Sequence, residues 1–215
     1  MLNVVNIKAF DLPQAWFQCL GAVIQHGYEY VIDHGSFEGT KRKELDFVEV
    51  HITHPGTRSL IPFIPEGVPC PTSMEYVEQY LSYLMTSIKA PNEQYTYGEY
   101  IEPQMFKIIE NYKKYGSNSN QNYITIGDQN SIDLTDPPCL RGIDTRIRYG
   151  KLHFMVYFRS WDLWGGFPSN MAALQLLKET MACDIGVEDG ELIASSKGLH
   201  LYDYTWDLAK RVCYL

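Results

Sequence analysis

The most restrictive feature of the sequence is a run in which apolar and polar side chains alternate. Residues 146–159 read RIRYGKLHFMVYFR. Within 151–159 the apolar members Leu152, Phe154, Val156 and Phe158 share one face of an extended chain, and the intervening residues share the other. Tyr149-Gly150 supplies a turn before this run. The pattern predicts two strands joined by a tight turn, the second of them with one apolar face.

Helical and extended patterns are mixed along the rest of the chain. Strand-like composition occurs at 44–55, at 123–128 and at the start of 190–212. Apolar residues recur at helical spacing in four segments and at the end of a fifth, namely 15–26, 74–88, 100–116, 169–186 and the second half of 190–212. No regular strand-helix-strand alternation appears. The sequence therefore predicts an α+β fold, with residues 1–215 forming a single domain around a curved mixed β-sheet with flanking helices.

Several helix ends can be assigned from local residues. Thr72 or Ser73 can cap the helix over 74–88, and Gly116 is a natural end for the helix over 100–116. The helix over 169–186 looks strongly amphipathic, with Ser169 as a candidate cap.

Composition excludes several classes of protein. The chain has 215 residues, 45% of them hydrophobic, and no apolar run of about 18 residues, so we expect one substantial core and no membrane span. No secretory signal precedes the first helix, and the five cysteines form no close pair, which favours a reducing cytoplasm over a disulfide framework or a zinc site. A net charge of −8 disfavours nucleic acid as a partner, whereas a local group of arginines can still bind one phosphate.

Cys139 is the candidate nucleophile. It follows two prolines in LTDPPCLRGID, and Arg141, Arg146, Arg148 and Arg159 lie close to it in sequence. Prolines stiffen the approach to the thiol, and neighbouring cations favour the reactive thiolate. A single cysteine is more often a small buried hydrophobe, so this segment alone leaves both interpretations open.

Three motifs in fixed order carry a more specific signal. The segment FRSWDLWGGFPSNMA contains every fixed position of R-S-x-D-x-x-x-G-x-P-x-N. P-P-C precedes it by 20 residues, and H-x-Y follows 30 residues after its asparagine. This arrangement resembles the thymidylate synthase family, and most of all its short archaeal members. The strong similarity covers roughly residues 136–206.

The resemblance implies a methyltransferase that converts dUMP to dTMP with a methylene-bearing reduced pterin. Cys139 resembles the thiol that adds to carbon 6 of the pyrimidine. Glu78 resembles the glutamate that organises proton transfers, with Glu75 as a rival on the same helix, and Asp162 resembles a carboxylate with catalytic and pterin-binding roles. Gly166 belongs to the same pterin-binding motif. The implied nucleotide-binding residues are Arg42, Tyr97, Arg159, Ser160, Asn170, His200 and Tyr202. No metal is implied, and a homodimer packed sheet to sheet is expected.

Purely structural roles are also possible for three of these residues. Arg159 can simply pair with Asp162 at the surface, Tyr97 can belong to an aromatic turn, and His200 can be a strand histidine with a satisfied hydrogen bond.

The chain also departs from the family pattern. Leu140 stands where most members have histidine, and Phe158 stands where many have glutamine. SNSNQN lacks the paired arginines that a partner subunit usually lends to the phosphate. Arg141, Arg146 or Arg148 can substitute for them, and Arg58 competes with Arg42 as the flexible phosphate ligand. No counterpart of the pterin-covering carboxy-terminal segment is recognised, so tetrahydrofolate and tetrahydromethanopterin are both open as donors.

Two other functions remain in view. A pyrimidine nucleotide hydroxymethylase, acting on dUMP, dCMP or CMP, shares the first half of the mechanism. A non-catalytic nucleotide-binding homologue would retain only the fold. Asn170 favours uracil, because cytosine-acting relatives tend to have aspartate at that position.

Overall fold

The computed structural model describes residues 1–89, 91 and 93–214. Its main layer is a six-stranded sheet in the order β1-β4-β9-β7-β6-β5. These strands are β1 (Val4–Ala9), β4 (Phe47–Ile52), β5 (Tyr123–Thr125), β6 (Leu140–Arg148), β7 (Lys151–Phe158) and β9 (Glu188–Ser196). The pairs β1-β4 and β7-β9 are parallel and the other neighbours are antiparallel, so the sheet is mixed, as predicted.

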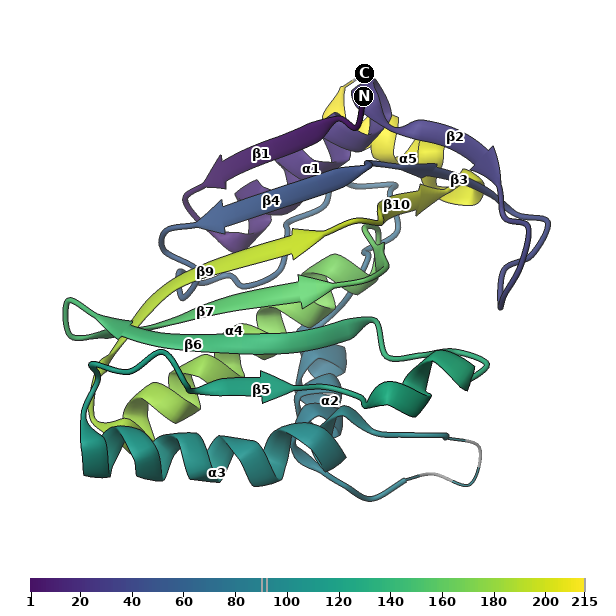
Figure 1. Cartoon of the computed structure of the whole chain (residues 1–215). Helices are drawn as coiled ribbons and strands as arrows, with labels where there is room; N and C mark the ends of the chain where they lie inside the picture. The colour runs from purple at the N-terminus through teal and green to yellow at the C-terminus, as the bar shows by residue number, and fades with distance from the viewer. Residues whose placement is uncertain (90, 92, 215) are drawn as a thin grey trace.

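A smaller sheet continues from one end of the main one (Figure 1). Its order is β2-β3-β10-β8, and its strands are β2 (Tyr28–Val31), β3 (Lys41–Glu44), β8 (Trp161–Asp162) and β10 (Leu199–Tyr202). This sheet brings together segments about 160 residues apart, because Tyr202 pairs with Arg42 across β10 and β3.

Most helices cover one face of the main sheet, and the carboxy-terminal one packs against the smaller sheet and the first helix. The helices are α1 (Leu12–His26), α2 (Met74–Met85), α3 (Tyr97–Tyr115), α4 (Gly166–Ile185) and α5 (Asp203–Cys213), with a 3-10 turn η1 (Gln129–Asp133). Figure 1 shows α1, α2 and α4 behind the sheet, whose front face carries no helix. The α+β class is therefore confirmed. None of the described helices has the length and apolar character needed to cross a membrane.

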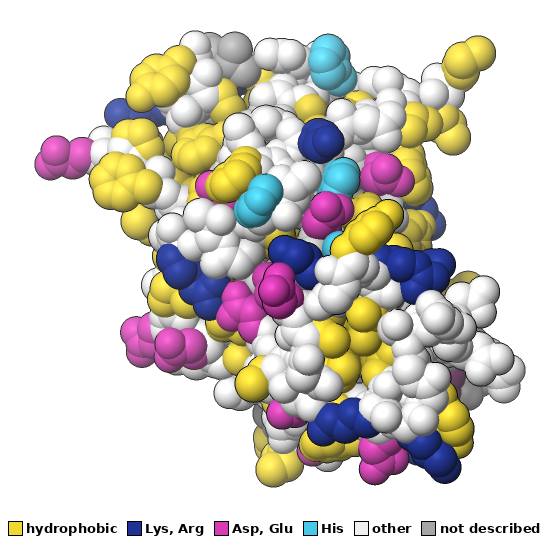
Figure 2. Space-filling model, turned by 90° about the vertical axis from the view of Figure 1, so that its left-hand side faces the viewer, with side chains coloured by type: hydrophobic (Ala, Val, Ile, Leu, Met, Phe, Trp, Pro, Cys, Tyr) yellow, Lys and Arg dark blue, Asp and Glu magenta, His cyan; other side chains and the backbone are white. Residues whose placement is uncertain are grey.

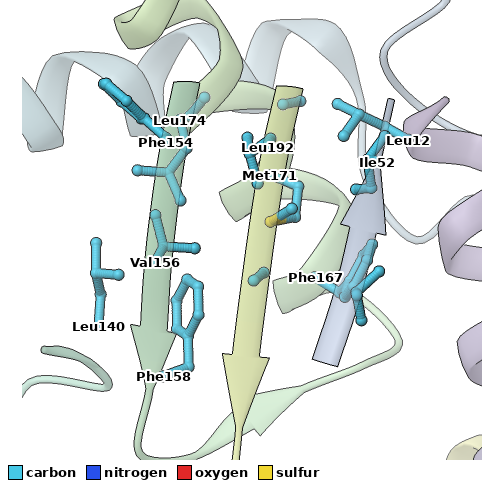
Figure 3. Packing of buried hydrophobic residues seen from close by; sticks show 14 of the residues in the cluster. Leu12, Ile52, Leu140, Phe154, Val156, Phe158, Phe167, Met171, Leu174 and Leu192 are labelled. Atoms are coloured by element: carbon cyan, nitrogen blue, oxygen red, sulfur yellow. The ribbon is translucent and has the colours of Figure 1, made fainter. Parts of the chain in front are cut away.

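The predicted hairpin is confirmed. β6 and β7 join through Tyr149 and Gly150, which have φ values of 54° and 74°. Positive φ at both central residues is the geometry of a type I′ turn, whose twist matches that of the strands. On β7 the buried residues Phe154, Val156 and Phe158 face the core with Phe167 and Met171 of α4 (Figure 3).

Helix α4 corrects two sequence-based predictions. It is buried on most sides rather than amphipathic, because the sheet, α1, α2 and α3 all contact it. A helix surrounded by other elements needs no polar face. Ser169 is not the cap, since α4 begins at Gly166. The buried Ser169 hydroxyl instead donates to the Gly165 carbonyl at 2.8 Å and bonds to the Thr72 hydroxyl at 2.7 Å.

The other helix ends agree better with the sequence. Ser73 caps α2 by accepting a hydrogen bond from the Tyr76 N–H. Gly116 ends α3 with φ of 79°. This helix begins three residues before its predicted start, because Thr96 caps it through the Glu99 N–H. The earlier start places Tyr97 in the first turn, directly behind Cys139.

Candidate active site

Backbone hydrogen bonds fix the position of Cys139. The residue immediately precedes β6, and its N–H donates to the Tyr97 hydroxyl at 3.1 Å, as the Leu140 N–H does at 3.3 Å. The Cys139 carbonyl accepts from the Arg159 N–H at 2.8 Å. The nucleophile candidate is thus held between the start of α3 and the end of β7, and its side chain is half-buried.

The electrostatic surroundings of the thiol are mixed. Burial raises the pKa of Cys139, and Arg159 acts in the opposite direction. A thiol with a raised pKa is protonated at rest, so nucleophilic attack requires a proton acceptor or a ligand that favours the thiolate.

Tyrosines surround the back of this site, and only Tyr97 was predicted. The ring of Tyr97 makes edge contacts with Tyr80, Tyr83 and Tyr95. Burial raises the pKa of Tyr97 far above its usual range, so the hydroxyl stays neutral and accepts from the two backbone amides. Tyr97 therefore positions the cysteine from behind and does not line the cavity in front of it. No sequence pattern indicated the other three rings.

Arg159 holds the proline segment. Its Nε donates to the Pro138 carbonyl at 3.2 Å, and its Nη2 donates to the Pro137 carbonyl and to Asp136 Oδ1, the last at 3.3 Å. Its ion-pair partner is therefore Asp136 rather than Asp162, the partner expected in the alternative interpretation. The Asp136 side chain is 69% exposed, so a bound anion can replace it at low cost.

One cavity of about 540 Å³ lies in front of Cys139. Six other predicted residues also line it, namely Arg42, Arg159, Ser160, Asp162, His200 and Tyr202. Sequence reasoning missed the opposite wall, which the β2–β3 loop forms with His34, Ser36 and Phe37. These positions carry no periodic or motif signal, and only the folding of the loop places them here.

His200 has one ring nitrogen, Nε2, that is left as a hydrogen-bond acceptor. Burial is the main cause that lowers the pKa of His200 to about 3, so the imidazole is neutral. Its Nδ1 lies 2.8 Å from the Gly198 carbonyl and must donate to it, which leaves Nε2 as an acceptor. This Nε2 is buried and has no hydrogen-bond partner among the described residues. A hydroxyl donor from a ligand would satisfy it.

Arg42 and Tyr202 stand beside this histidine. The Arg42 guanidinium donates to the Tyr202 hydroxyl at 3.1 Å and to the Tyr30 hydroxyl at 3.3 Å, and it lies 3.5 Å from Glu44 Oε2. The Arg42 Nε is buried without a partner in the described part of the chain. Because the Tyr202 hydroxyl accepts from Arg42, its own proton remains available for donation.

Asp162 lies at the mouth of the cavity and also closes the start of α4. Its Oδ2 accepts from the N–H groups of Gly165 and Gly166 at 3.0 and 2.8 Å. A Cβ at Gly166 would lie 3.2 Å from the Asp162 Cβ, so glycine keeps this turn tight. The carboxylate is fixed in place while its remaining lone pairs stay open to a ligand.

Asn170 lies one turn into α4. Its Oδ1 accepts a hydrogen bond of 3.0 Å from the indole Nε1–H of Trp161. The position of a Cβ at Gly166 would be 3.6 Å from this same oxygen, so the amide lies next to the Asp162 turn. Asn170 is not among the residues that line the cavity in front of Cys139.

The structure leaves other predicted residues outside this cluster. Glu78 is an exposed residue of α2 and does not line the cavity, and Glu75 is also exposed. Arg58 forms a two-pronged ion pair with Glu179, in which the two nitrogen–oxygen distances are 2.8 and 2.7 Å. That pair lies beside another cavity, so the structure places Arg58, the alternative to Arg42, away from the cavity in front of Cys139.

The arginines that follow Cys139 lie along β6. None of the three, Arg141, Arg146 and Arg148, lines the cavity in front of Cys139. The Arg148 side chain instead donates to the Ser117 carbonyl at 3.2 Å. Leu140 and Phe158, the two departures from the family pattern, are buried in the core.

These features define a class of protein: an α+β fold with a held cysteine facing a cavity that contains two arginines, a neutral histidine and a carboxylate. Residues 86–213 match the family model described as thymidylate synthase, so the chain belongs to the thymidylate synthase family, a family of methyltransferase enzymes.

The similar proteins agree with this assignment. A protein of Methanosarcina acetivorans named "Putative thymidylate synthase" is 28% identical over 96% of this chain and 93% of its own length. The protein of the same name from Methanothermobacter marburgensis is 23% identical over 96% and 97%. A deoxyuridylate hydroxymethyltransferase of Bacillus phage SP01 is 37% identical over 81 residues, which are 37% of this chain and 21% of that protein.

Proposed function

We propose that this protein methylates dUMP to dTMP, with a methylene-bearing reduced pterin as the second substrate. The observation that carries the proposal is the convergence of Cys139, Arg159 and the unpartnered Nε2 of His200 on one cavity. A thiol, a guanidinium and a hydrogen-bond acceptor are the groups needed for a pyrimidine ring, a phosphate and a sugar hydroxyl.

The nucleotide would be held at its two polar ends. The 3′-hydroxyl of the sugar donates to His200 Nε2 and accepts from the Tyr202 hydroxyl, because one group is an acceptor and the other has a free proton. The phosphate binds Arg159 and Ser160, displacing the exposed Asp136 carboxylate from the guanidinium. Arg42 lines the cavity beside Tyr202, holds its hydroxyl by a hydrogen bond, and is the second arginine available to the nucleotide.

The chemistry would begin at the thiol. Loss of the Cys139 proton lets the sulfur add to carbon 6 of the uracil, which moves an electron pair to carbon 5 and the carbonyl at carbon 4. Carbon 5 would then form a bond to the pterin-borne methylene carbon and lose its proton. Cleavage of the bond between that methylene carbon and the pterin nitrogen, hydride transfer from the pterin to the same carbon, and expulsion of the thiolate would give the methyl group and restore the ring double bond. The Asn170 amide stabilises charge on the carbon 4 carbonyl by hydrogen bonding.

The reduced pterin would supply the one-carbon unit and the hydride when bound. The wall around Asp162 fits such a ring, since a fixed carboxylate with open lone pairs faces the cavity alongside the aromatic rings of Phe37 and Tyr204. Tetrahydrofolate and tetrahydromethanopterin derivatives share this ring system, so both are candidate donors.

One further observation favours a second product. The phage relative over 81 residues is named a deoxyuridylate hydroxymethyltransferase. In such a reaction water replaces the hydride in the last step, and the roles of Cys139, Arg159 and His200 are unchanged. We rank this product second, because the relatives that cover 96% of the chain carry the other name.

A homodimer in the cytoplasm completes the proposal. The face of the main sheet opposite the helices carries the part-exposed side chains of Met155, Tyr157 and Ile193. A second copy packed on this face would bury them, and β6 would bring Arg141 or Arg146 to the interface.

The test is release of tritium from carbon 5 of labelled dUMP, assayed with each pterin donor and with product analysis. We expect Cys139→Ser to lower the rate by about 10⁴-fold or more, because the nucleophile is lost. Cys183→Ser, at an exposed cysteine of α4, is the matched control. Persistent tritium release in Cys139→Ser would contradict the nucleophile assignment. A hydroxymethyl product in the unmodified protein would show that the enzyme hydroxymethylates dUMP and does not methylate it.

The same assay decides the role predicted for Glu78. A glutamate that manages proton transfer at the ring would make Glu78→Gln slower by at least about 10²-fold. Its exposed position on α2 instead favours a change of less than about threefold.

A further inference from the structure

Trp161 is a buried residue clamped between two aromatic rings. Its indole lies between Phe158, at 4.2 Å between ring centroids and 6° between planes, and Phe167, at 4.5 Å and 23°. The residue is only 2% exposed. A side chain clamped between two stacked rings cannot rotate without breaking both contacts, so its N–H direction is fixed.

That fixed N–H determines the orientation of the Asn170 amide. An indole N–H is only a donor, so the atom that faces it at 3.0 Å has to be the amide oxygen. Rotating the amide by 180° would place its NH₂ against the indole N–H, with two donors facing each other. The bond to Trp161 is the one that the described residues make to this amide, so the second lone pair of Oδ1 and both N–H groups of Nδ2 are open to a ligand.

The two amide orientations match different bases. Uracil presents an N3–H donor and an O4 acceptor, which pair with the oxygen and the NH₂ of an asparagine. Cytosine presents an N3 acceptor and an N4 amino donor, which pair with the same amide only after it has been flipped. An asparagine free to rotate would accept either ring.

We propose that Trp161 is a specificity-determining residue, which locks the Asn170 amide in the orientation that accepts uracil and rejects cytosine nucleotides. The proposal rests on the proposed function, in which Asn170 contacts the pyrimidine edge. Trp161 itself touches neither substrate and acts through the orientation of Asn170.

The test measures equilibrium binding of dUMP and dCMP by calorimetry, which needs no pterin and no turnover. Trp161→Phe keeps an aromatic ring in the stack and removes the N–H together with the five-membered ring that carries it. We expect the ratio of the two dissociation constants to move toward dCMP by about 10-fold, the equivalent of about 1.4 kcal/mol. Trp16→Phe is the matched control, because it removes another buried indole N–H, whose acceptor is the Leu163 carbonyl. The control should lower stability and leave the ratio unchanged.

A second background separates orientation from general damage. In Asn170→Asp the two carboxylate oxygens are equivalent, so there is no orientation left to lock. We expect Trp161→Phe to change the dUMP/dCMP ratio by less than about twofold in that background, against about 10-fold in the Asn170 background. A merely structural role would move the ratio equally in both.

The outcomes distinguish the two proposals. If the unmodified protein binds dUMP and Trp161→Phe keeps the original ratio, the orientation proposal is wrong and the proposed function stands. If the unmodified protein binds neither nucleotide, both proposals fail.

Discussion

The two ends of the main sheet hold charged side chains in contrasting ways. At the Cys139 end the nitrogen–oxygen distances of the ion pairs are long, 3.3 Å for Arg159–Asp136 and 3.5 Å for Arg42–Glu44, and the Asp136 side chain is exposed. At the other end, where β7 and β9 begin, the pairs are mostly shorter, with 2.7 Å for Arg58–Glu179 and 2.6 Å for His51–Glu191. Figure 2 shows that second end, where cationic, acidic and histidine side chains lie side by side.

A buried lysine lies within the tighter end. Lys178 of α4 is fully buried, donates to the Gly190 carbonyl and to the Glu191 carbonyl at 3.2 Å, and lies 3.2 Å from Asp189 Oδ1. Among the described residues, the Cys139 end has two buried nitrogens without hydrogen-bond partners, on Arg42 and His200, and the Lys178 end has two such oxygens, on Gln175 and Asp189. The open Asp189 oxygen still has the Lys178 ammonium 3.2 Å away, whereas Arg42 and His200 line the cavity in front of Cys139. The difference teaches that the Lys178–Asp189 pair holds the fold together, while the open nitrogens at the Cys139 end are placed to meet a ligand.

The largest effect on stability is expected when the buried ammonium group of Lys178 is removed. Lys178→Met leaves the Asp189 carboxylate without its cation, and we expect the free energy of unfolding to fall by about 3 kcal/mol. Urea denaturation measures the loss, and activity per folded molecule should be unchanged. Adding Asp189→Asn should restore part of the stability. An active-site defect in the folded fraction of Lys178→Met would show that the two ends are not separate.

A smaller effect is expected at the other end. Tyr202→Phe removes the hydroxyl that would donate to the sugar, and we expect kcat/KM for dUMP to fall by about 10-fold, as for one lost neutral hydrogen bond. Steady-state kinetics measures this change. Tyr115→Phe, which removes the hydroxyl of an exposed tyrosine at the end of α3, is the control. Equal effects of the two variants would contradict a sugar contact by Tyr202.

The smallest effect is a pH dependence of stability. Burial lowers the pKa of Lys178 to about 8 from 10.5, so between these values the unfolded chain binds the proton that the folded protein has released. The contribution of Lys178 to the free energy of unfolding is therefore lowest below pH 8. It rises with pH, by about 1 kcal/mol between pH 8 and pH 9. Urea titrations at both pH values measure the rise, and Lys178→Met should lack it. Identical slopes for the two proteins would show that Lys178 titrates normally.

Motif residues named from the sequence meet at one cavity in the structure. The cavity lining contains Cys139, Arg159, Ser160, Asp162, His200 and Tyr202, all of them from the three motifs. The role of Glu78 stays a prediction, because this residue of α2 is exposed and does not line the cavity. Sequence reasoning missed the β2–β3 loop, whose residues His34 and Phe37 reach the cavity only because that loop folds over it.

The sequence by itself determined the β6–β7 hairpin, the mixed α+β class and the family, because alternation, glycine turns and motif spacing are local properties of the chain. Only the tertiary structure decided which groups are satisfied and which are left open. His200 is neutral because it is buried, and Asn170 is oriented because Trp161 is stacked between two rings. Burial and hydrogen-bond direction depend on residues distant in sequence, and no local pattern encodes them.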